Sequence, residues 1–134
     1  MTEAPLPVVL VGAGNRSSSV YGPLLLGPLS ERLQLCSVVS RGRERGAALA
    51  KELCVPLADD LQDAVTRYGA RSVILCVSSP ENHLLAHQAL DLSLPCLLET
   101  PLALQLNDAA TLATRVAQTD IPIEVAEQNP RFPQ

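Results

Sequence analysis

Five short apolar runs alternate with helical segments along the chain, and this alternation restricts the fold more than any other feature. The runs cover residues 7–11, 33–39, 72–77, 95–98 and 121–125. Continuous apolar runs of this length are typical of parallel strands that are buried on both faces. Strands alternating with helices form β-α-β units with right-handed crossovers. The sequence therefore predicts an α/β fold, a doubly wound and mostly parallel sheet of about six strands with helices on both faces.

Helical spacing fills the segments between the runs. Residues 42–53 and 61–68 are predicted helices, and another is predicted to start with Ser79 as its cap and Pro80 at its first position. A further helix is expected to open at Asn107-Asp108. Apolar spacing selects the residues expected to face the core, which are Leu85, Ala89 and Leu92, with Leu84 beside them, and Ala110, Leu112, Ala113 and Val116.

Two other segments carry local signals. Glycine–proline pairs at 22–23 and 27–28 interrupt the stretch between the first two runs, so a broken or late-starting helix is expected there. Asp59, Asp60 and Asp63 are expected to start the helix over 61–68, because acidic groups are stabilised near a helix N-terminus. These acids need no catalytic role.

Length and charge narrow the classes of function. The 134 residues suit a single domain, predicted over 1–126 and followed by a tail over 127–134. The 14 acidic residues outnumber the 10 basic ones, and only 2% of residues are aromatic, so neither phosphate-backbone binding nor base stacking is expected. Nucleic acid is therefore not a predicted partner.

The sequence also predicts a cytoplasmic setting. The N-terminus lacks the basic flank and long apolar stretch of a signal peptide, and no window reaches the ~18 apolar residues of a membrane span, so no membrane association is expected. None of the four cysteines, Cys36, Cys54, Cys76 and Cys96, forms a C-x-x-C pair. They are expected to be buried thiols in a reducing compartment.

A glycine-rich loop, Gly12-Ala13-Gly14-Asn15-Arg16-Ser17, comes directly after the first run. The first glycine permits a tight turn, and the second lets the backbone approach a pyrophosphate at the N-terminus of a helix. Ser17 stands where the usual pattern has a third glycine, so the match is partial. Its place after the first strand of an alternating pattern nevertheless indicates a dinucleotide site.

The end of the second run bears on the choice of dinucleotide. An acidic residue commonly holds the ribose 2′-hydroxyl of NAD at this point, whereas this chain has Ser40 and Arg41. A hydroxyl group and a guanidinium group can both hold a 2′-phosphate. We therefore favour NADP(H), with NAD(H) as the alternative. A plainer interpretation is that Arg41, Arg43 and Arg45 form a solvated helix start.

Four markers in order carry a resemblance to a known family. They are the glycine loop, Ser40-Arg41, Ser78-Ser79-Pro80-Glu81-Asn82-His83 and Leu98-Glu99-Thr100-Pro101-Leu102-Ala103. From about residue 8 to 132 the chain resembles the N-terminal, Rossmann-like NAD(P)-binding domain of the glucose–fructose oxidoreductase and inositol dehydrogenase family (Gfo/Idh/MocA). The resemblance implies an oxidoreductase.

The resemblance also implies roles for individual residues. Gly12, Gly14, Asn15, Arg16 and Ser17 would surround the pyrophosphate, and Ser40 and Arg41 would meet the adenosine ribose or its phosphate. The remaining implied cofactor-site residues are Ser78, Ser79 and Pro80 near the nicotinamide half, His83 at the start of its helix, Glu99 by the nicotinamide ribose, and Thr100 and Pro101 beside it.

The chain departs from the family pattern in two respects. The usual Glu-Lys-Pro reads Glu99-Thr100-Pro101, and threonine cannot act as a general acid near neutral pH. Lys51, the only lysine, lies in a different segment, so the catalytic residues stay unknown. Family members also continue into a substrate-binding α/β domain, and here the chain stops at about the point where that domain would begin.

Three functional hypotheses follow. The first is an NADP(H)-binding oxidoreductase domain that needs a second domain or a partner chain for hydride transfer. The second is a non-catalytic scaffold or regulatory subunit that stabilises a partner enzyme. The third is a small reductase formed by self-association, with Arg131-Phe132 closing a neighbour's cleft. The tail after Val125 is expected to be exposed, because Phe132 has no evident packing partner in this chain, and this predicts a homo-oligomer or a complex with a partner protein.

Two other motifs favour structural interpretations. His83 and His87 have the spacing of a two-histidine metal site, but no third ligand is evident, so no metal is predicted. Ser17, Ser18 and Ser19 lack the glycine-flanked elbow of a serine nucleophile and are interpreted as loop-forming or phosphate-contacting hydroxyl groups.

Overall fold

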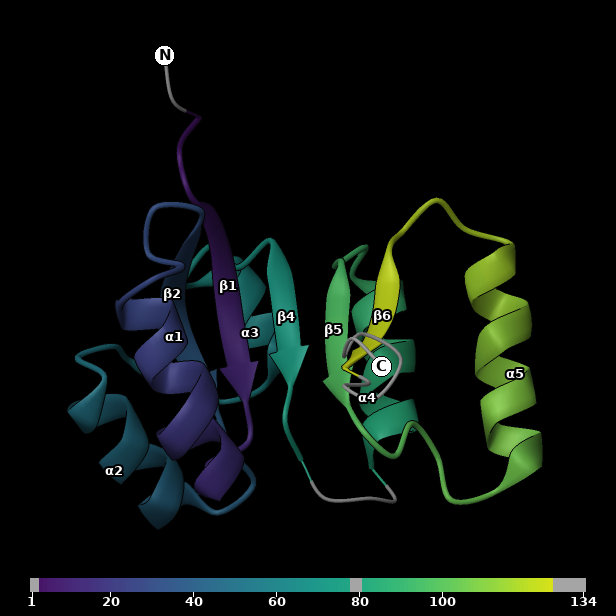
Figure 1. Cartoon of the computed structure of the whole chain (residues 1–134), viewed down its shortest axis with the longest axis horizontal. Helices are drawn as coiled ribbons and strands as arrows, with labels where there is room; N and C mark the ends of the chain where they lie inside the picture. Colours follow the sequence, from purple (N-terminus) through teal and green to yellow (C-terminus); the bar gives the residue numbers. More distant parts are fainter. Residues whose placement is uncertain (1–2, 78–80, 127–134) are drawn as a thin grey trace, which may run out of the picture.

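Six parallel strands form a single sheet in the computed structural model, which describes residues 3–77 and 81–126. The strand order is β3-β2-β1-β4-β5-β6, and each neighbouring pair is parallel (Figure 1). This confirms the predicted doubly wound α/β fold. The strands are β1 (Leu6–Val11), β2 (Leu33–Val39), β3 (Leu57–Ala58), β4 (Ser72–Leu75), β5 (Cys96–Glu99) and β6 (Ile123–Ala126).

Helices cover both faces of the sheet. The π-helix η1 (Ser17–Tyr21) continues directly into α1 (Gly22–Leu26), so the break expected at Gly22-Pro23 does not occur, and the helical stretch ends only at Gly27. In Figure 1, α1 and α2 stand in front of the sheet and α4 stands behind it. The other helices are α2 (Arg43–Glu52), α3 (Leu61–Thr66), α4 (Asn82–Asp91) and α5 (Leu106–Ala117).

The central strand β1 is apolar throughout because both of its faces are covered. Val9 and Val11 face the core shared with α3, α4 and α5, whereas Val8 and Leu10 face the core shared with η1, α1 and α2. All four side chains are at most 3% exposed. Successive side chains of β1 thus point alternately into two different cores. Because both cores are apolar, the strand is a continuous apolar run.

One strand was not predicted from the sequence. β3 has only two residues, Leu57 and Ala58, which pair with the end of β2. Such a short pair between Pro56 and Asp59 carries no periodic signal. It extends the sheet at the edge beyond β2.

Several predicted details of α4 and α5 are wrong. The first α4 residue is Asn82, with Glu81 as its cap, and the predicted cap and first helical residue, Ser79 and Pro80, lie outside the described residues. The predicted core residue Ala89 is confirmed as buried, and Leu85 and Leu92 are partly buried against the core, whereas Leu84 is exposed. The other buried residues of α4 are Asn82, Ala86 and Leu90. α5 begins at Leu106, and its two predicted inward alanines, Ala110 and Ala113, are both exposed.

The α5 error has a simple geometric cause. Leu112 is the buried residue of this helix, and Val116 packs beside it. These two positions are one helical turn apart and define a narrow inward stripe. Alanine gives only a weak indication of whether a helix position faces the core, because its small side chain is found both in cores and on surfaces.

The prediction that Cys54 is buried is also wrong. Cys54 is exposed just after α2, where its φ of 58° turns the chain away from the helix.

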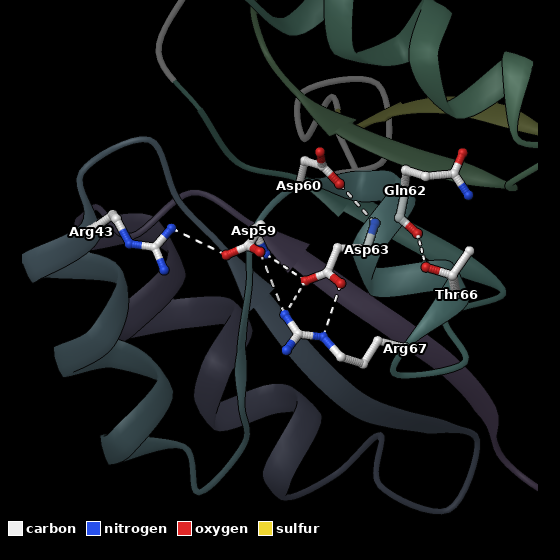
Figure 2. A network of polar contacts seen from close by, with 7 residues as sticks. All are labelled: Arg43, Asp59, Asp60, Gln62, Asp63, Thr66 and Arg67. Carbon is white, nitrogen blue, oxygen red and sulfur yellow. Dashed lines mark hydrogen bonds and ion pairs between the residues drawn. The ribbon is translucent and has the colours of Figure 1, made fainter.

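Polar contacts fix the start of α3, as the acidic residues there predicted (Figure 2). The Asp60 carboxylate accepts a hydrogen bond of 2.7 Å from the Asp63 N–H and so caps the helix. Arg67 pairs with Asp63 at 2.6 Å and with Asp59 at 3.6 Å. Asp59 also pairs with Arg43 at 3.2 Å, which ties the first turn of α2 to the segment before α3.

Within the described ranges, no helix is long and apolar enough to cross a membrane.

Candidate functional site

The carboxyl ends of the parallel strands meet at one edge of the sheet, at the bottom of Figure 1. After β1 the chain continues to β2 on one side, and β4 later pairs with β1 on the other side. The order of strands therefore reverses between β1 and β4. Ligands of open α/β sheets bind outside such a reversal point, because the loops leave in opposite directions and open a crevice.

The glycine loop follows β1 at this point. Gly12 has a φ of 111°, and its N–H donates a 2.8 Å hydrogen bond to the Val39 carbonyl at the end of β2. A Cβ atom at Gly12 would overlap the backbone carbonyl of Cys76 after β4. Gly12 is therefore required by both its backbone conformation and its close packing.

Gly14 lies in contrasting surroundings. A Cβ atom placed there would have no neighbour within 4 Å, so the loop presents open backbone at this position. Asn15, Ser18 and Arg45 border the adjoining hollow. Unhindered backbone beside a helix start is the arrangement that admits phosphate groups.

Ser17 lies beneath the loop rather than on its surface. Its side chain is fully buried beside the Cys76 thiol. Burial raises the pKa of that thiol, and the Ser17 hydroxyl partly offsets the effect. Ser17 thus occupies the close-packed third position of the glycine motif, where a small residue is needed.

A pocket of about 280 Å³ lies between the ends of β1 and β2. Ser40, Arg41 and Glu81 border both this pocket and a second hollow of about 390 Å³ next to the glycine loop. The two are therefore adjacent. The first has an apolar side, formed by Val11, Val39, Leu61, Val77, Leu84 and Leu85, and a polar side, formed by Ser40, Arg41, Asp59, Asp60, Glu81 and Gln88.

Charged groups at this pocket pair with one another. Arg41 forms an ion pair with Glu81, and the Ser40 hydroxyl donates to the Gly42 carbonyl at 3.1 Å. Arg43 points instead to Asp59 (Figure 2), whereas Arg45 borders the second hollow. The three arginines of the predicted basic cluster therefore lie in different surroundings. Of the three, only Arg41 lines the pocket beside Ser40.

Glu99 ends β5 on the other side of the crevice. Its Oε1 atom accepts from Arg16 Nε at 3.2 Å and from the Tyr21 hydroxyl group. The Glu99 side chain is only 13% exposed. Burial is the main cause that raises the pKa of Tyr21, and the hydrogen bond to Glu99 adds to it, so Tyr21 stays protonated as the donor.

Asn82 fixes the backbone after Glu99. This fully buried amide, the first residue of α4, donates to the carbonyls of Glu99 at 2.9 Å and Pro101 at 3.1 Å. The Thr100–Pro101 peptide is cis, and both residues are exposed. The end of β5 is therefore attached to the start of α4 at the edge of the crevice.

The His83 side chain contacts α5. Its Nε2 atom is 3.7 Å from an Asp108 carboxylate oxygen on α5. The predicted residues Ser78, Ser79 and Pro80 lie outside the described part of the chain. Within residues 3–77 and 81–126, no group of three or more histidine, cysteine, aspartate or glutamate residues is arranged to hold a metal ion.

Sequence reasoning missed three residues of this edge. Tyr21 lies in the helical stretch after the glycine loop. Glu81 and Asn82 lie inside the Ser78-to-His83 marker, but neither was among its predicted site residues. Their contacts join segments that are far apart in the chain; Tyr21 and Glu99, for example, are 78 residues apart. Local spacing carries no signal for such pairs.

Comparison with known proteins identifies the family of this chain and other proteins that share its fold. Residues 6–126 match the Gfo/Idh/MocA family, described as an oxidoreductase family with an NAD-binding Rossmann fold. No curated protein sequence matches the chain.

Solved structures share the fold at low identity. The WlbA dehydrogenase from Chromobacterium violaceum, in complex with NADH and UDP-GlcNAcA, superposes with a TM-score of 0.85 at 20% identity, over 98% of this chain and 37% of its own. Apo scyllo-inositol dehydrogenase from Lactobacillus casei superposes with a TM-score of 0.83 at 18% identity, over 94% of this chain and 38% of its own. A 3-ketoreductase from Actinomadura kijaniata, in complex with TDP-benzene and NADP, superposes with a TM-score of 0.77 at 16% identity, over 90% of this chain and 38% of its own. The chain thus spans little more than a third of each of these proteins.

Proposed function

Because the chain belongs to the Gfo/Idh/MocA oxidoreductase family, we propose that it binds NADP(H) along the carboxyl edge of its sheet. The observation that carries this proposal is the glycine loop at the strand reversal. Gly12 is pressed against Cys76, which brings the loop backbone close to the sheet, and Gly14 leaves that backbone open. A dinucleotide pyrophosphate is the group that such a loop accommodates.

The adenosine half would occupy the pocket between β1 and β2. Its apolar side suits an adenine ring, and Ser40 and Arg41 on its polar side suit a ribose 2′-phosphate. Glu81 opposes this preference in part, because its carboxylate pairs with Arg41 and could accept from a 2′-hydroxyl group. NAD(H) is therefore the alternative cofactor. Among the similar structures, one holds NADH and another holds NADP.

Hydride transfer would need further groups beyond this chain. A substrate must be held against the nicotinamide with an acid–base partner, and Thr100 supplies no such group near neutral pH. The similar solved proteins are between two and three times as long. We propose that a second domain, a partner chain or a second copy supplies the substrate-binding part.

Titration with NADPH and NADH, followed by nicotinamide fluorescence, tests cofactor binding. We expect saturable binding of both, with the tighter binding for NADPH. The Gly14→Trp variant fills the open side of the loop and should abolish binding while it retains the wild-type melting temperature. The absence of binding at millimolar cofactor would remove the proposal.

Thr100 favours a second candidate function, a non-catalytic subunit that stabilises or regulates a partner enzyme. Co-purification would identify that partner, whose activity should rise when this chain is added. Retention of this activation by Gly14→Trp would support a scaffold, whereas its loss together with cofactor binding would support the oxidoreductase domain.

A further inference from the structure

Tyr21 connects the glycine-loop side of the site to the β5 side. Its ring packs in the core cluster with Leu10, Leu25 and Cys76, and the residue is 8% exposed. Its hydroxyl group leaves this core and donates to Glu99 Oε1. A buried aromatic ring with a polar tip commonly fixes the partner of that tip, because the packed ring permits little movement.

The π-helix determines where this ring points. The Gly22 N–H donates to the Ser17 carbonyl, five residues earlier, rather than to the carbonyl four residues earlier. This wider turn places both Ser17 and Tyr21 on the buried side. Short π-helical turns are frequent at functional sites, and this one brings Tyr21 to the end of β5.

The contacts of Glu99 leave one carboxylate oxygen for a ligand. Both donors, Arg16 Nε and the Tyr21 hydroxyl, engage Oε1. Within residues 3–77 and 81–126, no hydrogen bond or ion pair engages Oε2. An ionised carboxylate with one oxygen held in place can accept from a ligand hydroxyl group with the other.

The position of Glu99 selects which part of a dinucleotide could reach it. Ser40 and Arg41 mark the adenosine side, next to β2, whereas Glu99 ends β5 beyond β4. A dinucleotide that lies across the strand reversal extends its second nucleoside toward β4 and β5. The hydroxyl groups that arrive near Glu99 would therefore belong to the second ribose.

We propose that Tyr21 is a positioning residue, which fixes Glu99 so that Oε2 accepts a hydroxyl group of the second ribose of the dinucleotide. This inference rests on the proposed cofactor function. Tyr21 itself lies in the core and need not touch the ligand. Its contribution would therefore concern the second half of the cofactor, and the adenosine half should be unaffected.

The test compares two probes on the full chain. NADPH contains the second ribose, whereas adenosine 2′,5′-bisphosphate contains only the adenosine half and its phosphates. Tyr21→Phe removes the hydroxyl group and retains the ring, and it should weaken NADPH binding about tenfold while changing bisphosphate binding by less than about twofold. Loss of packing alone would not change the ratio of the two affinities.

Two further variants complete the design. Tyr68→Phe alters the other tyrosine of the chain, which lies after α3, and should leave both affinities at the wild-type value. Glu99→Gln should weaken NADPH binding, and adding Tyr21→Phe to it should weaken binding much less than in the wild type, because both changes act on one contact.

The outcomes distinguish the positioning role from the cofactor function. Unchanged NADPH affinity in Tyr21→Phe, equal weakening of both probes, or additive effects with Glu99→Gln would overturn the role of Tyr21 while cofactor binding stands. Failure of the wild-type chain to bind either probe would overturn both. A selective loss for NADPH that Glu99→Gln masks would establish the inference.

Discussion

Gly12 and Gly14 belong to one loop, but an added methyl group would meet opposite surroundings at the two positions. At Gly12 it would overlap the Cys76 carbonyl on a backbone with a φ of 111°, and at Gly14 it would meet no atom within 4 Å. Gly12→Ala should therefore cost about 1–3 kcal/mol or more in the free energy of unfolding. Chemical denaturation measures this loss directly.

Gly14→Ala is the matched variant. It should change the free energy of unfolding by less than about 0.5 kcal/mol, because the methyl group points into open space. It should nevertheless weaken cofactor binding, since the space it fills is the space that we assign to the phosphates. Equal stability losses in the two variants would contradict the structure of the loop.

Arg41 and Glu81 are predicted to set the cofactor preference in opposite directions. Arg41→Ala should weaken NADPH binding about tenfold and leave NADH binding nearly unchanged, because a charge-assisted contact to the 2′-phosphate is lost. Glu81→Gln should strengthen NADPH binding relative to NADH, because it removes a negative charge from the same pocket. Fluorescence titrations measure both ratios.

Arg43→Ala is the control for this pair. Arg43 is two residues from Arg41 but does not itself line the pocket, and its partner Asp59 retains an ion pair with Arg67 when Arg43 is removed. The NADPH-to-NADH ratio should therefore stay at the wild-type value. A ratio that changes as much in Arg43→Ala as in Arg41→Ala would show that general positive charge, and not a specific contact, sets the preference.

At the scale of elements, α3 has a start that depends on pH. Hydrogen bonds from Arg67 and from the Asp59 N–H hold the pKa of Asp63 below its usual range. A carboxyl group with a lowered pKa in the folded state stabilises the fold above the pKa it has when unfolded, about 4. That stabilisation is lost as the pH falls through the lower value of the folded state.

Asp63→Asn should therefore reduce the acid sensitivity of the fold. The melting temperature of the variant should be lower than that of the wild type at neutral pH, and the difference should shrink below about pH 4. Asp120→Asn, which removes an exposed carboxyl group outside the network of Figure 2, controls for the change in net charge. A difference between Asp63→Asn and the wild type that is constant with pH would contradict the assignment.

The elements also show what the sequence could and could not predict. Apolar runs such as 33–39 became strands because burial on both faces leaves a strong local signal. The two-residue β3 and the facing of Ala110 on α5 depend on tertiary contacts and leave none. The glycine loop was evident locally, but the approach of Tyr21 to Glu99 depends on packing between distant segments.

In the molecule as a whole, helices cover one face of the sheet more completely than the other. α3, α4 and α5 pack on one face of the sheet from β1 to β6, whereas η1, α1 and α2 pack on the other face around β1 and β2. An apolar groove of about 210 Å³ crosses Val8, Ile74 and Leu97 on that second face. Leu104 and Leu106, near the start of α5, are 63% and 84% exposed. Exposed apolar surface of this kind commonly marks contact with another protein surface.

We therefore predict that the chain self-associates or binds a partner protein. Light scattering of the purified chain should give a mass above 14.2 kDa at micromolar concentration, and Leu106→Asp should reduce that mass if α5 contributes to the contact. Leu26→Asp changes another exposed leucine, on α1 and away from α5, and serves as the control. A monomeric mass at every concentration would contradict self-association.

An NMR titration of the labelled chain with NADPH would locate a dinucleotide at the carboxyl edge of the sheet. We expect the backbone amide shifts to gather at Gly12, Gly14, Ser40 and Glu99, at the ends of β1, β2 and β5. The amides of Leu6, Leu33 and Cys96, where those strands begin, should stay unchanged. Shifts confined to the beginnings of the strands, or none at millimolar NADPH, would show that no dinucleotide binds at this edge.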